Sequence, residues 1–296
     1  MTHGSLALHR GALFVGSSAK TAHVRVFDLD GAPLEAGFSF IDRALGRSSA
    51  VGLAVDDDRH VWVADGAAQR VRLFTLFGAE IGGLGVGQED LAAELVPDRA
   101  GEVRAPVDVA VEGDSDGLKV VVASGGERRH AVQLFGGSGA LVRSLRSEGD
   151  PSRPFRAVAG VGLLGRTLAV AEAGAGRVQV FRDLEYHFAF APCARPCEPT
   201  AVAVLPDGRF VVAHRGARGG VELCDASGGR LATLARAGVL DGEVDEPSDL
   251  AVDAAASDRA SRVFVIDQEG GRVQVFTLEG RCYGSFPGLS AAPRLG

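Results

Sequence analysis

An acidic residue and an arginine recur together, five residues apart, at three places in the chain. The pairs are Asp65 with Arg70, Glu172 with Arg177, and Asp267 with Arg272. Opposite charges at this spacing can bind a ligand, or they can form an ion pair that closes the loop between them. Elsewhere the corresponding positions lose both partners together: Ser17 with His23, Ser124 with Ala131, and His214 with Gly220. Because both partners disappear at once, we interpret the pairs as structural fastenings.

Cysteine is the other residue type with a suggestive spacing. Cys193 and Cys197 are separated by three residues, whereas Cys224 and Cys282 stand alone. A four-thiolate metal site needs a second close pair, which the chain lacks. We therefore interpret residues 193–197 as a connecting loop with incidental thiols, with a labile disulfide as the alternative.

The elements that must position these residues form six similar units. Each unit begins with a short apolar strand that has a small residue near its centre, namely Ala7, Ala54, Ala110, Ala159, Ala203 and Ala251. A second apolar strand follows, then a third such as Val273–Phe276, and then a weaker fourth strand. Period-two alternation of Val, Phe and Thr is typical of strands rather than helices.

Six units of four antiparallel strands, packed radially, predict an all-β six-bladed β-propeller that forms one domain over residues 1–296. The expected blades are 5–41, 49–85, 105–147, 154–191, 198–236 and 246–288. A small residue in each first strand suits a crowded central axis, and the phenylalanine of the third strand suits the wider space between blades. With this phasing no strand crosses from blade six to blade one, so side-chain packing would close the ring. A one-strand shift, with the N-terminal strand completing the last blade, is the alternative.

The pattern of proline, apolar-apolar-Ala-Val, a turn, Val-Ala-Asp and Arg-Val-Gln-Val-Phe resembles the NHL repeat. Residues 246–284 match it best, and 49–83 and 155–190 follow. WD and kelch repeats fit less well, because they need recurrent tryptophan or tyrosine and the chain has 1 Trp and 2 Tyr. The resemblance implies a six-bladed scaffold that binds proteins or single-stranded RNA.

Longer polar loops follow the second strand in the odd-numbered units. In a propeller these loops share one face with the connections between blades. We expect this loop-rich face to bind an acidic or phosphate-bearing partner through Lys20, Arg128, Arg129, Arg156, His214, Arg215 and Arg218. Glu89, Asp90 and Glu94 interrupt the basic character, so RNA is a minor option.

Metal-dependent catalysis is the alternative function, either a lyase or a hydrolase with its site at the mouth of the central channel. His23, His130 and His214 lie near one end of three alternate blades and are the best candidates for a shared zinc site. The fold also loosely resembles amidating lyases, but the tyrosine and arginine partners of those enzymes cannot be placed here. Lactonase-type propellers hold calcium with asparagine, and this chain has no asparagine. We therefore expect no cofactor and no metal.

Composition sets the remaining bounds. The formal net charge of −7 argues against a surface that follows phosphate backbones. We expect no signal peptide at the N-terminus, because His9 and Arg10 interrupt its apolar run. We expect a cytoplasmic, monomeric binding scaffold for a protein or another macromolecule, without a membrane segment.

Overall fold

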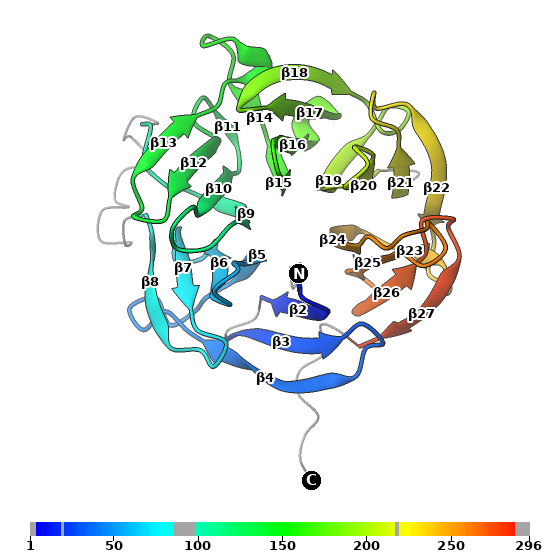
Figure 1. The fold of residues 1–296 in the computed structure, drawn as a ribbon, viewed down its shortest axis with the longest axis horizontal. Coiled ribbons are helices and arrows are strands. Elements are labelled where there is room, and N and C mark those ends of the chain that lie inside the picture. Colours follow the sequence, from blue (N-terminus) through cyan, green and yellow to red (C-terminus); the bar gives the residue numbers. More distant parts are fainter. Residues whose placement is uncertain (1–3, 19–20, 86–98, 217–218, 288–296) are drawn as a thin grey trace.

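The computed structural model describes residues 4–18, 21–85, 99–216 and 219–287. In this part of the chain the strands form six blades of four antiparallel strands around a central channel; a short parallel strand, β23, extends the sheet of blade five, and β11 and β14 form a separate two-stranded sheet (Figure 1). Each blade uses four strands that are consecutive in sequence, except that a short additional strand, β11, interrupts blade three. The predicted fold class, a six-bladed β-propeller, is confirmed. No helix among the described residues is long and apolar enough to span a membrane.

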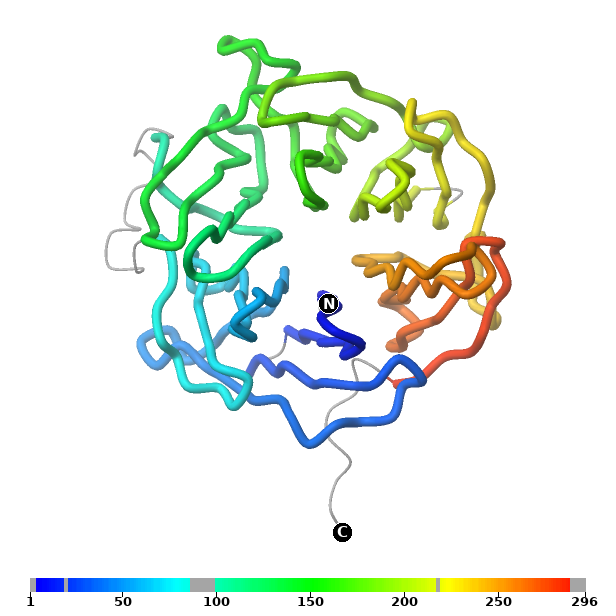
Figure 2. The backbone as a smooth tube through the Cα atoms, viewed as in Figure 1, coloured from blue at the N-terminus to red at the C-terminus, as the bar shows by residue number. Residues whose placement is uncertain are grey.

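The strands of the first three blades follow the chain from the channel outward (Figure 2). They are β1 (Gly4–His9), β2 (Ala12–Ser17), β3 (Ala22–Asp28) and β4 (Pro33–Phe40); β5 (Ala50–Val55), β6 (Val61–Asp65), β7 (Arg70–Phe74) and β8 (Glu80–Leu84); and β9 (Pro106–Glu112), β10 (Lys119–Ser124), β12 (Val132–Gly136) and β13 (Leu141–Ser144).

The last three blades repeat this order. They are β15 (Val158–Leu164), β16 (Thr167–Glu172), β17 (Arg177–Arg182) and β18 (Glu185–Phe190); β19 (Glu198–Val204), β20 (Phe210–Arg215), β21 (Gly220–Cys224) and β22 (Arg230–Ala237); and β24 (Pro247–Asp253), β25 (Arg262–Asp267), β26 (Arg272–Phe276) and β27 (Cys282–Phe286).

Short elements hold the connections between blades. Two residues of the blade-three loop, β11 (Glu127–Arg128), pair with β14 (Phe155–Arg156) in the connection to blade four. β23 (Glu243–Val244) runs parallel to the end of β22 and leads into blade six. Two 3-10 turns, η2 (Ser147–Gly149) and η3 (Ala173–Ala175), shape the loops around blade four.

The small residue of each first strand lies in the channel wall, but in blade four the sequence pattern assigned this position to the wrong residue. There Gly162 pairs with Ala169, as Ala203 pairs with Val211 in blade five, so Gly162 and not Ala159 holds the repeated position. A Cβ atom on Gly162 would lie 2.4 Å from the carbonyl oxygen of Val202 on the neighbouring strand. Since β15 and β19 approach too closely for alanine, the motif changes to glycine and its register becomes hard to read.

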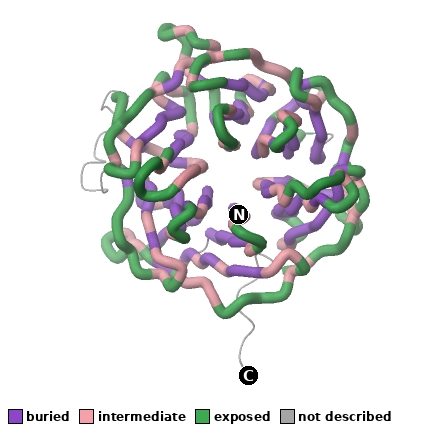
Figure 3. The backbone as a smooth tube through the Cα atoms, in the orientation of Figure 1, coloured by how far each residue is buried: buried purple, intermediate pink, exposed green. Residues whose placement is uncertain are grey.

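The core consists of apolar clusters that each join two neighbouring blades. Buried third-strand phenylalanines enter these clusters as expected, including Phe74, Phe135, Phe181 and Phe276. Burial follows the middle strands of each blade, whereas the outer turns are exposed (Figure 3). A single four-stranded sheet would be marginally stable, so contacts between blades supply most of the hydrophobic stabilisation.

The ring closes without strand exchange, as the phasing predicted. Among the described strands, none from blade one joins the sheet of blade six. Phe264 and Ile266 of blade six instead pack with Leu6 and Leu13 of blade one. The amide of Leu6 also donates a hydrogen bond to Asp249 across the seam, at 2.7 Å.

The recurrent acidic residues fasten each incoming connection to its blade. In blade six, the Arg272 Nε atom lies 2.8 Å from Asp267, and the amide of Asp245 donates to the same carboxylate at 2.9 Å. In blade four, Arg177 Nε donates to Glu172 at 2.6 Å and the amide of Arg156 does so at 2.7 Å. The acidic residue therefore holds the loop that follows it and also the chain that enters the blade.

Blade two departs from the expected pairing. Arg70 binds Asp42 at 3.2 Å and not Asp65, because Arg72 takes its place. The guanidinium of Arg72 lies 3.3 Å from Asp65, 2.6 Å from Glu80, and against the rings of Phe40 and Phe74. The predicted Asp65–Arg70 pair is therefore wrong, although Asp65 still anchors the amide of Ser49 at 2.9 Å.

Sequence reasoning missed a third member of the fastening. Gln274, seven residues after Asp267, donates to it at 3.0 Å and accepts from the amide of Gly242 at 2.9 Å. Gln179 likewise donates to Glu172 at 2.7 Å and accepts from the amide of Glu148 at 2.8 Å. The recurrent Val-Gln-Val-Phe motif was the available signal, because a glutamine on a buried strand needs partners for its amide.

Candidate functional site

Those of the predicted basic residues that the structure describes do not line one cavity: Arg156 and Arg215 belong to different cavities. Arg128 is half-buried, and its Nε atom donates to the carbonyl of Gly125 at 2.8 Å. Arg129 and Arg156 are exposed. Lys20 and Arg218 lie outside the described residues, as do Glu89, Asp90 and Glu94. Their place on this face stays a prediction.

Two of the predicted residues are turned away from solvent or neutralised. His214 is 2% exposed, because it is the last buried residue of strand β20, one residue before the strand ends at Arg215. Arg215 is half-buried, with Nε 3.2 Å from Glu246 and a second nitrogen 3.2 Å from Gln268. The expectation that His214 contributes to a binding surface is wrong, and the charge of Arg215 is already paired.

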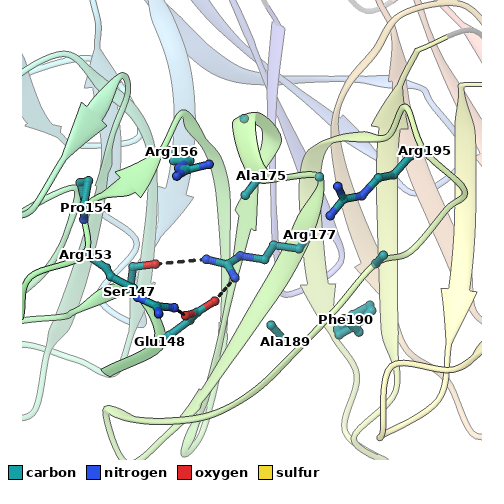
Figure 4. A pocket seen from close by; sticks show the side chains of 13 residues that line it. Ser147, Glu148, Arg153, Pro154, Arg156, Ala175, Arg177, Ala189, Phe190 and Arg195 are labelled. Carbon is teal, nitrogen blue, oxygen red and sulfur yellow. Dashed lines mark hydrogen bonds and ion pairs between the residues drawn. The ribbon is translucent and has the colours of Figure 1, made fainter. Parts of the chain in front are cut away.

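An arginine-lined cavity of about 770 Å³ lies instead beside blade four, on the same loop-rich face. Three segments build it: the connection from blade three, the η3 loop, and the end of β18 with the connection to blade five. Four arginines line it, namely Arg153, Arg156, Arg177 and Arg195. Figure 4 shows these side chains, with Phe190 and Ala189 on the apolar side of the cavity.

Two of the four arginines are already ion-paired. Arg177 binds Glu172 and Glu148, and Arg153 binds Glu148 and lies 3.3 Å from Asp150. The hydrogen bond from Arg177 holds the pKa of Glu148 below its usual value, so this carboxylate is charged at neutral pH. Glu148 thus fixes two guanidinium groups at one side of the cavity.

The other two arginines are free to bind a ligand. Arg156 and Arg195 are exposed, and in the described part of the chain neither guanidinium has an ion pair or a hydrogen bond. β14 holds Arg156, because its amide is anchored on Glu172. Arg195 projects from the loop between Cys193 and Cys197, which a disulfide closes. Four guanidinium groups face Glu148 as the one acidic lining residue, so the cavity carries excess positive charge.

Arg153 and Arg195 were not among the sequence-predicted site residues, and Arg177 was predicted only as a fastening. None of them belongs to a repeated binding pattern, because each comes from a different connection or loop. The usable signal was the number of arginines in the segments on either side of blade four. The repeat pattern did not reveal this signal, because its longest polar loops belong to the odd-numbered blades.

A second cavity, of about 1060 Å³, occupies the mouth of the channel. Small and apolar residues dominate its lining, and the charged residues that line it within the described chain are Arg47 and Arg215. That lining contains no carboxylate, imidazole or thiol. The donor set that a metal-dependent enzyme needs is therefore absent from the described wall of the mouth.

Two carboxylates lie deeper in the channel. Asp108 on β9 of blade three and Asp249 on β24 of blade six line it, and these two strands lie on opposite sides of the ring in Figure 1. Asp108 accepts from the amide of Val161 at 2.8 Å, and Asp249 accepts from that of Leu6 at 2.7 Å. Each aspartate thus ties its own blade to the next one, which is a structural role.

The three histidines proposed as a zinc site do not come together. His130 Nδ1 lies 2.7 Å from the Ser144 hydroxyl, and His214 is buried in blade five. Among the residues that the structure describes, one group has His, Cys, Asp or Glu ligand atoms close enough to share a metal ion. It consists of Cys193, Cys197 and His214.

Comparison with known proteins supports the fold and leaves the family open. No protein-family model matches the chain, and no curated protein matches its sequence. Solved structures with a similar fold include the WD40 β-propeller domain of Doa1, with 14% identity, a TM-score of 0.58, and coverage of 92% of this chain and 78% of that one. Virginiamycin B lyase from Staphylococcus aureus has 12% identity, a TM-score of 0.59, and coverage of 96% and 83%.

Hydrazine synthase of Kuenenia stuttgartiensis is also similar, with 16% identity, a TM-score of 0.63, and coverage of 93% and 76%. The chain is therefore a β-propeller protein. At these identities the likeness is one of fold alone, and membership of the NHL family stays a proposal. The similar structures include two enzymes and a WD40 domain, so the fold alone does not show whether this protein is an enzyme or a binding protein.

Proposed function

We propose that this protein is a non-enzymatic binding scaffold that recognises an acidic or phosphorylated segment of a protein partner in the arginine-lined cavity. The observation that carries the proposal is the pair of unpaired guanidinium groups, Arg156 and Arg195, beside two arginines that Glu148 already orients. Arginine suits carboxylate and phosphate groups because its planar fork can donate two hydrogen bonds at once.

The shape of the cavity favours a side chain with its flanking residues over a bare ion. Its volume of about 770 Å³ lies within the range of small-ligand pockets. Phe190, Ala189 and Ala191 offer apolar contact opposite the arginines. The alternative, a metal-dependent lyase or hydrolase at the channel mouth, has less support because the described lining there lacks metal ligands.

Fluorescence anisotropy with synthetic peptides tests this function. The probes are a glutamate-rich peptide, a phosphoserine peptide and a glutamine-substituted control, each at low and high salt. The Arg156→Glu/Arg195→Glu variant should weaken binding by about tenfold or more, because a hydrogen bond to a charged group is worth roughly 1.5–3 kcal/mol. Binding to the wild type should also weaken as salt screens the charges.

A charge-matched control distinguishes this cavity from general electrostatics. Arg182 and Arg236 are exposed and lie outside the cavity. The Arg182→Glu/Arg236→Glu variant should bind the anionic peptides nearly as the wild type does. An equal loss of peptide affinity in the two variants would refute the proposal. So would a wild-type protein that binds neither anionic peptide at low salt. Dependence on Arg156 and Arg195 for single-stranded RNA, without peptide binding, would replace the protein partner by RNA.

A further inference from the structure

The connection between blades four and five brings two thiol groups and a buried imidazole together. Cys193 and Cys197 form a disulfide in this loop, and His214 lies beneath it at the end of β20. The sulfur atoms and a ring nitrogen all lie within 4.8 Å of one another. Cys197 and His214 are buried, and Cys193 is partly exposed, so the group lies just below the surface.

His214 has no hydrogen-bond partner in this setting. Its side chain is 2% exposed, and neither ring nitrogen makes a hydrogen bond to any described residue. The nearest acidic group is Glu222, whose carboxylate oxygen lies 3.5 Å from Nε2. A buried polar group without a partner costs roughly 1–3 kcal/mol, so something outside the protein chain is expected to satisfy this ring.

Blade five differs at this position from blades two, four and six. In blades two, four and six the corresponding acidic residue accepts a hydrogen bond from the incoming connection, as Glu172 does from Arg156. Blade five has His214 at that position and Glu222 where blades four and six have the fastening glutamine. The fastening is therefore replaced by a histidine, a carboxylate and a cysteine-bearing connection, which together supply metal ligands.

The loop is held in position from both sides. A Cβ atom on Gly176 would lie 2.9 Å from the carbonyl oxygen of Cys197, and one on Gly216 would lie 3.2 Å from that of Pro196. These glycines let the loops of blades four and five press against the loop backbone. The Cα atoms of the two cysteines are 5.8 Å apart, which lets both thiolates reach one tetrahedral ion.

We propose that, once the disulfide is reduced, Cys193, Cys197 and His214 bind one thiophilic divalent cation of the zinc class. A zinc ion binds sulfur at about 2.3 Å and nitrogen at about 2.0 Å, so two of its ligand atoms can lie up to roughly 4 Å apart. The ligand atoms here already lie within 4.8 Å of one another, and reduction lets the two sulfur atoms move apart to make room for the ion. A carboxylate oxygen of Glu222 lies 3.5 Å from Nε2, where it can accept a hydrogen bond from an Nε2–H group once the ring shifts, which leaves Nδ1 as the metal ligand. A carboxylate behind a ligating histidine is the usual outer partner at zinc sites.

The proposed reaction has two steps, reduction of the disulfide and then binding of the cation. Two molecules of a low-molecular-weight thiol supply two electrons and two protons; the sulfur–sulfur bond breaks, and the two thiols leave as one disulfide. Binding of the cation then releases the two cysteine protons, because thiolates are the ligands. The site is thus either a disulfide or a metal centre, with water in the fourth coordination position.

Cobalt(II) is the probe that tests the proposal. The full-length protein is reduced with a phosphine, freed of reductant without air, and titrated with Co²⁺. We expect one equivalent to bind, with the visible bands of a tetrahedral ion and thiolate-to-cobalt charge transfer. Zinc should displace cobalt and protect Cys193 and Cys197 from alkylation, which mass spectrometry of the peptides detects.

Matched variants define the ligands. Cys193→Ser and His214→Gln should each abolish stoichiometric binding, and Glu222→Gln should weaken it by about 10–100-fold. Cys282→Ser removes a thiol elsewhere and should leave the titration unchanged. Burial raises the pKa of Cys224 to about 12, so this thiol stays protonated and should not compete.

Two results would overturn the proposal. One is reduced protein that binds no cobalt or zinc while circular dichroism shows it folded. The other is binding that survives Cys193→Ser or His214→Gln. Because Cys193 is partly exposed, the serine variant is expected to fold, and its melting temperature verifies this independently of metal.

Discussion

Asp249 is a carboxyl group that the channel wall holds by two backbone amides, those of Leu6 and Leu250. Burial in this wall raises its pKa to about 7. Asp108 lies across the channel, and burial together with the charge of Asp249 raises its pKa well above the ordinary value. The two groups therefore keep protons in the folded protein that they would lose in the unfolded chain.

The stability of the propeller should consequently fall as pH rises. Between the unfolded pKa of about 3.9 and the folded value of about 7, the folded state binds more protons, so the free energy of unfolding decreases with pH. Asp249→Asn should cost stability at pH 5, because it loses one acceptor oxygen. By pH 8 the difference from wild type should shrink, since the carboxylate of the wild type is then charged in a channel wall that favours its neutral form.

Urea unfolding at several pH values measures this effect. Asp116→Asn, on an exposed turn, serves as the control and should keep a constant difference from wild type. A constant difference for Asp249→Asn across pH 5–8 would contradict the raised pKa.

At the scale of single elements, the fastening networks set where the connections run. Asp267 is buried and holds Arg272 and Gln274 of β26 and the amide of Asp245 in the incoming connection, so three groups from two segments depend on one carboxylate. Arg272 also binds Asp241, whose side chain is 77% exposed. One arginine thus has a buried and an exposed partner, which makes a matched pair for mutation.

Asp267→Ala should destabilise the protein by about 2–5 kcal/mol, because it removes the buried acceptor of Arg272 and of the Asp245 amide and leaves the buried side-chain amide of Gln274 with one partner fewer. Asp241→Ala should cost only about 0–1 kcal/mol, as exposed ion pairs do. Chemical denaturation of both variants provides the comparison. Equal, small losses would mean that the acidic residue does not fasten the connection.

The sequence predicted the blades well because strand alternation and the Val-Gln-Val-Phe motif are local properties. The sequence-based prediction was wrong in two places, where contacts between residues far apart in the chain determine the structure. The register of blade four depends on the close approach of Gly162 to Val202, which no local pattern reveals. In blade two, Arg72 displaced Arg70 at Asp65, because a buried arginine between two phenylalanine rings reaches the carboxylate better.

The candidate site was harder to predict than the fold. Arg153, Arg156, Arg177 and Arg195 converge only because the connections before and after blade four bend toward the same loop. His214 looked like a loop residue, because it stands at a strand end where sibling blades carry an acid. His214 is buried because the corresponding position near the end of the second strand is buried in every blade of this fold, whichever residue type stands there. Binding residues on connections therefore need the fold before they can be identified.

At the scale of the whole molecule, the seam between blades one and six is the one joint without a connecting peptide. All neighbouring blades contact each other through side chains, but the other five joints also have a chain running from blade to blade. The seam relies on the cluster around Phe264, on the Phe27–Phe286 ring contact at 5.1 Å, and on Arg262 with Asp30 at 2.7 Å. We expect local opening to begin there.

Phe264→Ala tests this expectation. The cavity should reduce the free energy of unfolding by about 3–5 kcal/mol, as buried phenylalanine truncations do. Phe181→Ala removes a comparable ring between blades three and four, where the chain is continuous. Hydrogen exchange separates the two variants: Phe264→Ala should accelerate exchange first in β1 and β24, whereas Phe181→Ala should leave those strands protected until global unfolding. If both variants accelerate exchange in the same strands, the lack of a connecting peptide does not weaken the seam. Side-chain packing alone would then hold all six pairs of neighbouring blades equally strongly.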